Sequence, residues 1–396
     1  MAADTDRAGS VTPATLRRRL ADGDPVTLLD VRDRTEIERW RIEAPSITHH
    51  HVPYVKFVAA GVTGDVADLL PADVREPVIA VCPRGEASAE VADQLVAAGV
   101  DAENLAGGME AWARLYDRVE IATADADVTI YQYRRPASGC LGYAVVADGE
   151  MVVVDPLRAF VDRYRDDAAD LDATLTHAVD THVHADHVSG VRALARAGAT
   201  PVLPARAVER GVTDGSDFET VTDGDELAVG DATLRAVALP GHTTGMTGFA
   251  VGGAEPRSAG DRTESGGTLL TGDSLFLDGV ARPDLQEDAD PEAQARDLYT
   301  TLTERLARFP DDTLIAPGHT DAGVEAGAAV ASLGDLRDRL PVFGMDEAAF
   351  VDHVTRVGAE PANADRIVAI NRGHESVDDA EAFELELGPN NCAAGG

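Results

Sequence analysis

The chain has 396 residues, enough for between two and three domains of about 150 residues each. Hydrophobic residues make up 44% of the chain, and no stretch approaches the roughly 18 consecutive apolar residues that a membrane span requires. The 34 basic and 70 acidic residues give a net charge of -36, which argues against a general basic face for nucleic acid. We therefore expect a globular protein that binds neither nucleic acid nor membrane.

The acidic excess is spread along the whole chain, and Lys56 is the single lysine among the basic residues. Such a surface repels itself at low salt and is usual in proteins that work in concentrated salt. The N-terminus carries Asp4 and no apolar segment behind it, so it does not resemble a secretory signal. These features predict a cytoplasmic protein of a salt-adapted organism.

The first 118 residues alternate apolar runs with helical patterns. Strands are expected at 26–29 and 78–81, and helices at 13–20, at 87–98 and in a last segment that ends at Leu115. Strands separated by helices predict a parallel sheet. The histidine triplet 49–51 is expected in a solvent-facing loop.

From Val128 onward the pattern changes to strand pairs, with Asp148-Gly149 as a hairpin turn. This change predicts a second α/β domain with two mixed sheets. Its expected strands are 129–133, 141–146, 151–154, 174–179, 232–239, 247–251, 268–270 and 313–316, and its expected helices lie near 157–167, 187–197 and 291–308.

Seven metal-capable side chains follow apolar strands of this second domain. They are His182, His184, Asp186 and His187 in one Thr-His-Val-His-Ala-Asp-His run, His242 and His319 each in a Pro-Gly-His-Thr run, and Asp273 in Thr-Gly-Asp-Ser. Loops at strand ends aim side chains at a shared crevice, and imidazole with carboxylate is a ligand set for zinc or ferrous iron. A lone histidine is usually structural, but this spacing indicates a metal centre.

With these motifs, residues 125–387 resemble the metallo-β-lactamase fold, an αββα sandwich with the metal at one edge of its two sheets. Within that superfamily the segment looks most like the persulfide dioxygenase and glyoxalase II branch. Both branches carry the seven metal-capable residues, so this motif does not separate them. Arg282 and Asp284 match the segment that follows the aspartate ligand in persulfide dioxygenases.

The resemblance implies two alternative centres. In the dioxygenase, His182, His242 and Asp273 would hold one Fe(II) per domain, and the other four side chains would orient ligands and handle protons, with Asp186 among the catalytic residues. In the hydrolase, His184, Asp186, His187 and His319 would complete a site for two zinc ions. Arg282 would act at the substrate by holding an anionic group of a thiol, unless it only forms a salt bridge with Asp284.

Residues 1–118 contain a second reactive motif, in which Cys82 ends a strand and a short loop runs into a helix. Such a loop points backbone N–H groups inward and stabilises a thiolate or persulfide. The whole span resembles a rhodanese, a sulfur-transfer domain. The resemblance implies that Cys82 is the catalytic residue and that Arg84 and Gly85 bind substrate.

The sequence thus predicts a rhodanese-like domain at 1–118, a metallo-β-lactamase-fold domain at 125–387 and a tail at 388–396. The leading hypothesis is a persulfide dioxygenase that converts a small thiol persulfide and O2 to sulfite and thiol, coupled to sulfur transfer that involves sulfite or thiosulfate. The alternatives are a di-zinc thioester hydrolase and a non-catalytic sulfur carrier or sensor. Members of this branch are often dimers, so the resemblance allows a homodimer, but the sequence itself does not indicate the oligomeric state. Cys140 is expected to be a small buried residue near the site.

Overall fold

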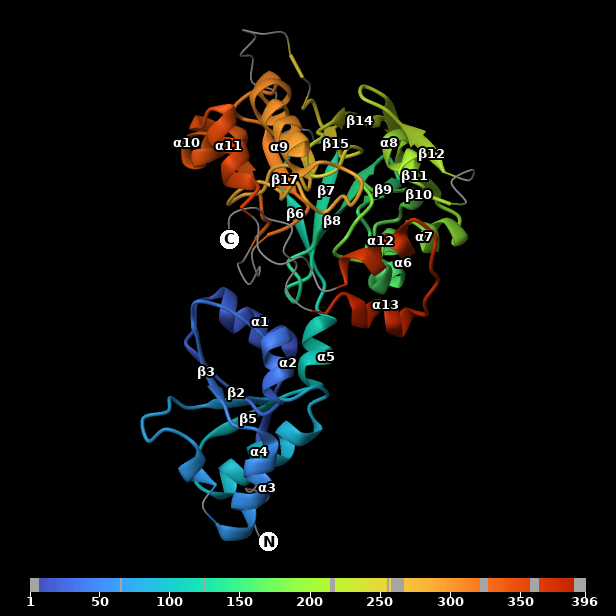
Figure 1. Cartoon of the computed structure of the whole chain (residues 1–396). Helices are drawn as coiled ribbons and strands as arrows, with labels where there is room; N and C mark the ends of the chain where they lie inside the picture. Colours follow the sequence, from blue (N-terminus) through green and yellow to red (C-terminus); the bar gives the residue numbers. More distant parts are fainter. Residues whose placement is uncertain are drawn as a thin grey trace.

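The computed structural model describes residues 7–64, 66–123, 126–213, 218–254, 256–257, 267–320, 327–356 and 363–387. These ranges form two domains, the N-terminal one below the other in Figure 1. The expected tail at 388–396, with Cys392, lies outside the described residues. No helix within those ranges combines the length and the apolar character that crossing a membrane requires.

The N-terminal domain is built on a five-stranded parallel sheet in the order β1-β5-β4-β2-β3. Leu28 and Leu29 of β2 are both fully buried but belong to different clusters, because successive side chains of a strand point to opposite faces. One face packs on α1 and α5 and the other on α3 and α4, so the sheet is covered on both sides. The elements are β1 (Gly9–Val11), α1 (Pro13–Ala21), β2 (Val26–Asp30), α2 (Arg34–Arg39), β3 (Ile47–His51), α3 (Tyr54–Thr63), β4 (Val78–Val81), α4 (Glu86–Ala97), β5 (Ala102–Leu105) and α5 (Gly108–Ala113).

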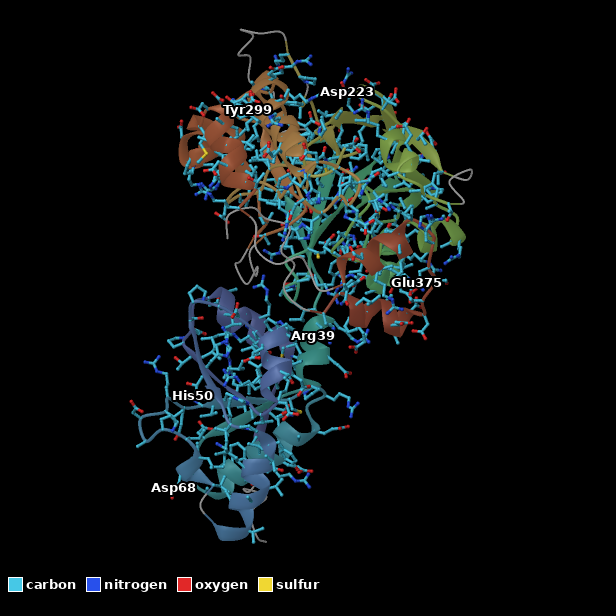
Figure 2. The ribbon with its side chains drawn as sticks, in the orientation of Figure 1. Arg39, His50, Asp68, Asp223, Tyr299 and Glu375 are labelled. Carbon is cyan, nitrogen blue, oxygen red and sulfur yellow. The ribbon has the colours of Figure 1, made fainter. Side chains whose placement is uncertain are left out.

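The predicted loop at the histidine triplet is wrong. His49, His50 and His51 belong to β3, an edge strand of this sheet, and pair with 28–30 of β2. His50 is labelled on this edge in Figure 2. The polar residues of β3 misled the prediction because an edge strand need not be apolar.

The second domain is a sandwich of a seven-stranded and a six-stranded sheet, in the orders β12-β11-β10-β9-β8-β7-β6 and β13-β14-β15-β16-β17-β18. Side chains from both sheets form one core between them, and helices cover the two outer faces. This αββα architecture agrees with the predicted fold class. The strands are β6 (Asp117–Ile121), β7 (Thr129–Arg134), β8 (Leu141–Ala147), β9 (Glu150–Val154), β10 (Thr174–Val179), β11 (Thr200–Pro204), β12 (Glu219–Val221), β13 (Glu226–Val229), β14 (Ala232–Ala238), β15 (Thr247–Val251), β16 (Thr268–Gly272), β17 (Leu314–Pro317) and β18 (Ala331–Ser332). The helices are α6 (Val161–Asp170), α7 (Val191–Arg196), α8 (Ala205–Glu209), α9 (Pro291–Thr300), α10 (Leu333–Arg339), α11 (Glu347–Val354), α12 (Ala364–Asn371) and α13 (Asp379–Leu385).

Several element boundaries differ from the sequence prediction. The helix expected near 157–167 is α6, Val161–Asp170, and the α-helix expected to end near 308 is α9, which ends at Thr300. Strand β6 pairs with β7, so the second sheet begins at Asp117 instead of after residue 125. The helix expected at 187–197 begins only at Val191, because the backbone of the residues before it bonds to other segments. For example, the Val188 N–H donates to a Glu386 carboxylate oxygen, 2.8 Å away. Residues 182–190 are therefore an irregular loop.

Helix α13, near the end of the described chain, connects the two domains. Its Phe383 is 4% exposed and lies in the core cluster of the N-terminal domain. The Arg114 guanidinium stacks 4.2 Å from the centre of the Phe383 ring. Arg39, labelled in Figure 2, donates to the Glu384 carbonyl. The C-terminal end of the second domain is thus part of the packing of the first.

We predict that Phe383→Ala lowers the free energy of unfolding by about 3–5 kcal/mol, the usual cost of removing a buried phenylalanine. Urea unfolding followed by circular dichroism in molar KCl measures this loss. Val62→Ala is the control, because Val62 is 87% exposed and its truncation should change stability by less than about 0.5 kcal/mol. Equal stability of the two variants would show that α13 does not hold the domains together.

Candidate metal centre and cysteine loop

The seven metal-capable residues lie together at one edge of the sandwich, as their positions after strands predicted. Residues 180–190 follow β10, and the loop of His242 follows β14. Asp273 and His319 directly follow the parallel neighbours β16 and β17. All seven residues are 8% exposed or less. A polar cluster buried this deeply needs partners for every charge.

His182, His242 and Asp273 form a three-residue group. The Nε2 atoms of the two histidines each lie 3.9 Å from Asp273 Oδ2. This spacing is below twice a metal–ligand distance of about 2.1 Å, so one ion can contact all three atoms. His182 Nε2 and Asp273 Oδ2 are buried and have no hydrogen-bond partner within the described ranges. The group therefore fits a metal ion, since unpaired buried polar atoms are otherwise costly.

The opposite nitrogens of both histidines are held by hydrogen bonds. His242 Nδ1 donates to the Arg282 carbonyl at 2.8 Å, which leaves Nε2 as the unprotonated nitrogen. His182 Nδ1 lies 2.9 Å from Thr181 Oγ1, whose own proton goes to Asp155. Burial lowers the pKa of both imidazoles, well below the usual value for His182. Both rings are therefore neutral and present a lone pair to a metal.

His184 lies beside His182, with ring centroids 4.2 Å apart, but its Nε2 points to two other carboxylates. Its Nε2 lies 3.0 Å from Asp155 Oδ1 and 3.6 Å from Asp180 Oδ1. Burial alone would lower the pKa of His184, but the Asp155 carboxylate and the hydrogen bonds raise it well above its usual value. The Nδ1 of His184 is therefore the nitrogen open to a metal, because this buried atom has no hydrogen-bond partner in the part of the chain that the structure describes.

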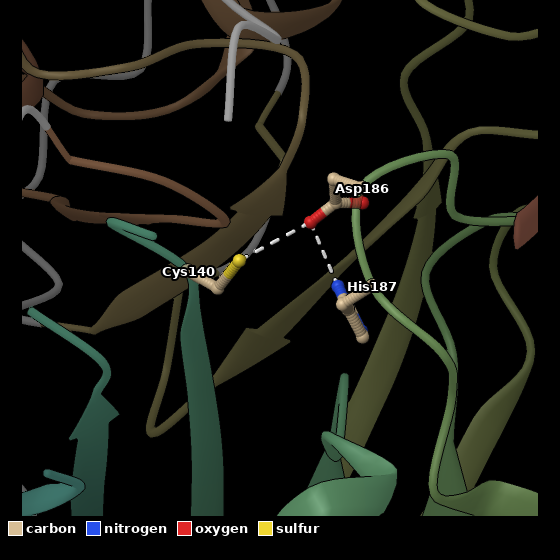
Figure 3. A group of neighbouring side chains, drawn as sticks. All are labelled: Cys140, Asp186 and His187. Atoms are coloured by element: carbon tan, nitrogen blue, oxygen red, sulfur yellow. Dashed lines mark hydrogen bonds and ion pairs between the residues drawn. The ribbon is translucent and has the colours of Figure 1, made fainter. Parts of the chain in front are cut away.

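Asp186, His187, His319 and Cys140 form a second cluster, part of which is drawn in Figure 3. His319 lies between two carboxylates, with Nε2 2.8 Å from Asp186 Oδ2 and Nδ1 2.8 Å from Asp273 Oδ1. His187 Nδ1 is 2.7 Å from the same Asp186 oxygen. Burial opposes the charge on Asp186, yet the charges of His187 and His319 hold its pKa well below the usual value. His319 thus joins this cluster to the ligand Asp273.

Cys140 is a member of this cluster, which the sequence did not reveal. The residue is 1% exposed, and its Sγ lies 3.4 Å from Asp186 Oδ2. Burial and Asp186 raise the pKa of the thiol, but His319 and hydrogen bonds from His187 and His319 outweigh them, so the pKa is lowered. The prediction of a small buried residue near the site agrees with its position but missed these polar contacts.

Asp155 is a site residue that the sequence analysis did not select. Its carboxylate accepts from the Thr181 N–H at 2.7 Å and from the Thr181 hydroxyl at 2.9 Å. Its φ of 51° is in the left-handed region, where a non-glycine residue is strained. Asp155 follows the buried strand β9, the same signal that identified Asp273. This signal could have found it.

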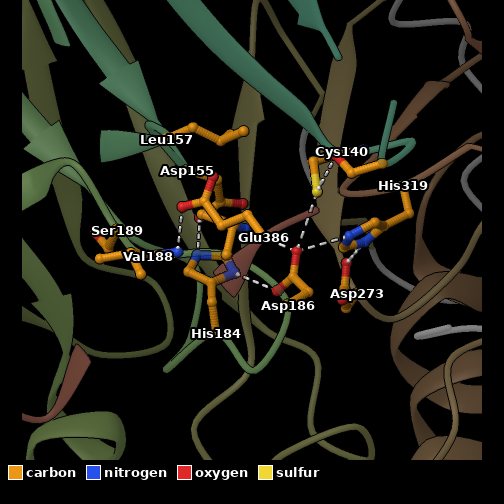
Figure 4. Close-up of polar contacts among 12 residues, drawn as sticks. Cys140, Asp155, Leu157, His184, Asp186, Val188, Ser189, Asp273, His319 and Glu386 are labelled. Atoms are coloured by element: carbon orange, nitrogen blue, oxygen red, sulfur yellow. Dashed lines mark hydrogen bonds and ion pairs between the residues drawn. The ribbon is translucent and has the colours of Figure 1, made fainter. Parts of the chain in front are cut away.

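Two residues from the C-terminal helices hold the backbone of the metal loop. The Asn371 amide donates to the carbonyls of His184 and His187, at 3.0 and 2.8 Å. Glu386 accepts from the Val188 N–H and pairs with Arg135, an ion pair that is fully buried. Figure 4 shows Glu386 and Val188 beside His184. The local sequence around these two residues does not predict their contacts with the metal loop.

Arg282 is 1% exposed, and its guanidinium pairs with Asp284 through two nitrogens at 2.7 and 2.8 Å. This is the salt bridge that the sequence left as the alternative to substrate binding. Its carbonyl holds the ring of His242. The structure thus gives Arg282 an orienting role, and contact of its guanidinium with substrate stays a prediction.

Cys82 lies at the end of β4 with its sulfur turned toward the start of α4. Sγ accepts from the Gly85 N–H at 3.1 Å and lies 3.4 Å from the Ser88 nitrogen. The Ser88 hydroxyl is 3.1 Å from the sulfur and 2.7 Å from Asn104 Oδ1. This is the inward-facing loop that the sequence predicts, and Ser88 adds a donor that the sequence analysis missed. A sulfur anion would be stabilised here.

Arg84 and Gly85, which the sequence predicts to bind substrate, differ in their position relative to the sulfur. Gly85 supplies the N–H that reaches the sulfur, whereas the Arg84 side chain is exposed and lies 3.8 Å from Glu86. Gly108 packs against the loop so closely that a Cβ would lie 2.2 Å from the Cys82 carbonyl oxygen. Helix α5 can therefore approach the cysteine loop only with glycine at this position.

Comparison with known proteins matches both domains to families. The rhodanese-like domain model covers residues 12–115, and the metallo-beta-lactamase superfamily model covers residues 135–319. The crystal structure of ETHE1 from Myxococcus xanthus is 30% identical, with a TM-score of 0.52, and the match covers 62% of this chain and 98% of that one. The chain belongs to the metallo-β-lactamase superfamily. Its metallo-β-lactamase domain is preceded by a rhodanese-like domain.

Two curated relatives mark different branches of this superfamily. The mitochondrial persulfide dioxygenase ETHE1 of Homo sapiens is 30% identical over 171 residues, which are 43% of this chain and 59% of that protein. The hydroxyacylglutathione hydrolase of Rhodobacter capsulatus is 31% identical over 169 residues, 42% of this chain and 57% of that protein. The chain thus spans about three fifths of the length of these relatives, and it carries a metallo-enzyme fold of a branch with both activities.

We predict that Gly318→Ala weakens metal binding about 10- to 100-fold, since a Cβ there would lie 2.3 Å from Asp273 Oδ1 and displace that carboxylate. Titration with Fe(II) or Zn(II) under anaerobic conditions measures the affinity. Gly344→Ala is the matched control, because a Cβ at Gly344 meets no atom within 4 Å. Unchanged affinity in Gly318→Ala would argue against Asp273 as a ligand.

Proposed function

We propose that this protein is a persulfide dioxygenase coupled to a sulfurtransferase. The metallo-β-lactamase domain would oxidise a small thiol persulfide, and the rhodanese-like domain would carry sulfane sulfur on Cys82. The overall reaction balances as RSSH + O2 + H2O → RSH + SO3²⁻ + 2 H⁺. The sulfane sulfur is oxidised and O2 is reduced.

The observation that carries the proposal is the composition of one ligand group. His182, His242 and Asp273 make a two-histidine, one-carboxylate set, which is typical of mononuclear non-haem Fe(II) sites. The further histidine of the motif, His184, is not a member of this group, and its Nε2 is engaged by Asp155. When bound, Fe(II) would supply the binding and activation of O2. Because only three side chains would hold the ion, substrate could also bind to it.

The residues around this set would manage protons and orientation. Asp186 is held ionised by His187 and His319, and His319 lies between Asp186 and the ligand Asp273. This chain of hydrogen bonds can accept a proton from the reaction and pass it between His319 and Asp186. Arg282 and Thr181 fix the rings of the two histidine ligands.

In the rhodanese-like domain, Cys82 would form a persulfide by taking sulfur from a donor. The step Cys82–SH + RSSH → Cys82–SSH + RSH conserves atoms and electrons, with the outer sulfur moving between thiols. Transfer of that sulfur to sulfite would give thiosulfate and restore the thiol. The donors from Gly85 and Ser88 would stabilise the anionic sulfur at each stage. The tether between domains would raise the local concentration of sulfite.

A di-zinc thioester hydrolase is the second candidate. Asp186, Asp273 and His319 also place ligand atoms within 4.8 Å of one another, so a second ion could share Asp273 with the first. The hydroxyacylglutathione hydrolase relative supports this alternative. The two candidates differ in metal content and in reaction. A measured content of one metal ion per chain, with oxidation of a persulfide, would favour the dioxygenase. Two metal ions per chain, with hydrolysis of a thioester, would favour the hydrolase.

The proposal predicts oxygen uptake by Fe(II)-loaded protein in molar KCl with glutathione persulfide, and sulfite formed in equal amount. Asp273→Ala should lose this activity, because a ligand is removed. An oxygen electrode and a sulfite assay measure both quantities, and hydrolysis of a glutathione thioester is measured in parallel. Hydrolysis without oxygen uptake by folded, iron-loaded protein would replace the dioxygenase with the hydrolase.

For the cysteine loop, we expect Ser88→Ala to slow sulfur transfer from thiosulfate or glutathione persulfide to cyanide about 10- to 100-fold. A hydrogen bond to a charged group is worth about 1.5–3 kcal/mol, which corresponds to that range. Thiocyanate formation measures the rate. Ser10→Ala is the control, since the Ser10 hydroxyl bonds the Asn104 carbonyl on an exposed edge. If Ser88→Ala forms thiocyanate as fast as wild type, Ser88 does not stabilise the sulfur anion.

A further inference from the structure

Two arginines face a cavity outside the sites described above. Arg210 follows α8 and Arg372 follows α12, and both line a cavity of about 50 Å³ together with Asp284, Glu287 and Asp365. A single water needs about 10–15 Å³, so this space holds several waters or one small polyatomic ion.

The guanidinium groups of these arginines lack partners that their burial would require. Arg210 Nε and Nη1 and Arg372 Nε are buried and make no hydrogen bond to any described residue. Burial, and then the charge of Arg372, lower the pKa of Arg210 to about 10, while Asp288 and Glu287 oppose this shift. Burial is the largest cause of this shift, so an anion bound beside Arg210 would favour its charged form.

An uncompensated pair of arginines is unexpected in this chain, which has 70 acidic residues and 34 basic ones. Arg366, on the same helix α12, pairs with both Glu375 and Glu381 at 2.6 Å. Within the described ranges no carboxylate oxygen is paired with Arg210 or Arg372, even though acidic residues line the same cavity. An acceptor-only ligand with negative charge would satisfy the buried N–H groups and remove the repulsion.

We propose that Arg210 and Arg372 bind a small oxyanion in this cavity. Carboxylates and sulfur oxyanions share the required chemistry, which is several acceptor oxygens and a negative charge. The site is new relative to the metal centre and the cysteine loop, and it does not depend on which reaction the metal domain performs.

The cavity lies between two segments that also position the metal centre. On one side, Asp284 holds the guanidinium of Arg282, whose carbonyl orients His242. On the other, Asn371 precedes Arg372 and holds the carbonyls of His184 and His187. An anion between these walls would therefore stabilise the segments that carry the ligands.

The first test measures the thermal stability of the full chain with sodium sulfate, at ionic strength kept constant with KCl. Saturating sulfate should raise the Tm of wild type by about 5 °C through binding to the folded state. Arg366→Gln is the control for general salt effects and should show the same rise. Arg372→Gln and Arg210→Gln should lose it.

The Tm of the same variants without sulfate gives a second test, which does not depend on the ligand. Without sulfate, Arg372→Gln should melt no lower than wild type, because one of two repelling charges is gone. A Tm of Arg372→Gln well below that of wild type would contradict this repulsion, and Arg210→Gln then decides whether sulfate binds. If sulfate raises the Tm equally in wild type and in these variants, the proposal that the two arginines bind an oxyanion is wrong.

Measuring the KM for glutathione persulfide with and without sulfate distinguishes two possible ligands, the carboxylate of the thiol substrate and a free sulfur oxyanion. If the ligand is the carboxylate of the thiol substrate, sulfate raises the KM of wild type for glutathione persulfide and leaves that of Arg372→Gln unchanged. If it is a free sulfur oxyanion, sulfate raises Tm without changing KM. Absence of turnover would count against the dioxygenase alone, because the sulfate-dependent Tm is measured without activity.

Discussion

The structure depends on how the backbone of residues 181–189 is held, since this loop carries four of the seven metal-capable side chains and has no regular secondary structure. Buried N–H and C=O groups must find partners, and here other segments supply them. Asp155 accepts the Thr181 N–H, Glu386 accepts the Val188 N–H, and Asn371 donates to two carbonyls. The loop geometry, and with it the direction of each imidazole, is therefore set by residues far away in sequence.

The same requirement ties the metal domain to the domain before it. Glu386 can accept from Val188 because its charge is balanced by Arg135, and neither side chain is exposed by more than 1%. Arg135 also donates to the Ala113 carbonyl at the end of α5. Buried pairs of this kind add little net stability, but loss of one partner costs about 3–5 kcal/mol. The pair therefore acts chiefly as a constraint that fixes the C-terminal segment against both the metal loop and α5.

The sequence predicted the fold class and the positions of the metal-capable residues because each of them follows an apolar strand. It could not show that His184 turns to Asp155 while His182 faces Asp273, since alternate residues in an irregular loop have no fixed direction. Strand β6 was missed because its sequence, Asp-Arg-Val-Glu-Ile, is mostly polar, as an edge strand can be. Glu386 and Asn371 gave no local signal. Glu386 contacts Val188, which lies 198 positions earlier in the sequence. Asn371 contacts His184, which lies 187 positions earlier.

Charge balance explains why the two reactive centres differ in construction. The metal centre combines Asp186 and Asp273 with histidines that neutralise them, so its buried carboxylates remain ionised without exposed counterions. The cysteine loop uses no charged side chain against the sulfur, and its donors are the Gly85 and Ser88 backbone and the Ser88 hydroxyl. A neutral cradle suits a sulfur atom that must alternate between thiol and persulfide, because no buried counterion is left unpaired when the negative charge leaves.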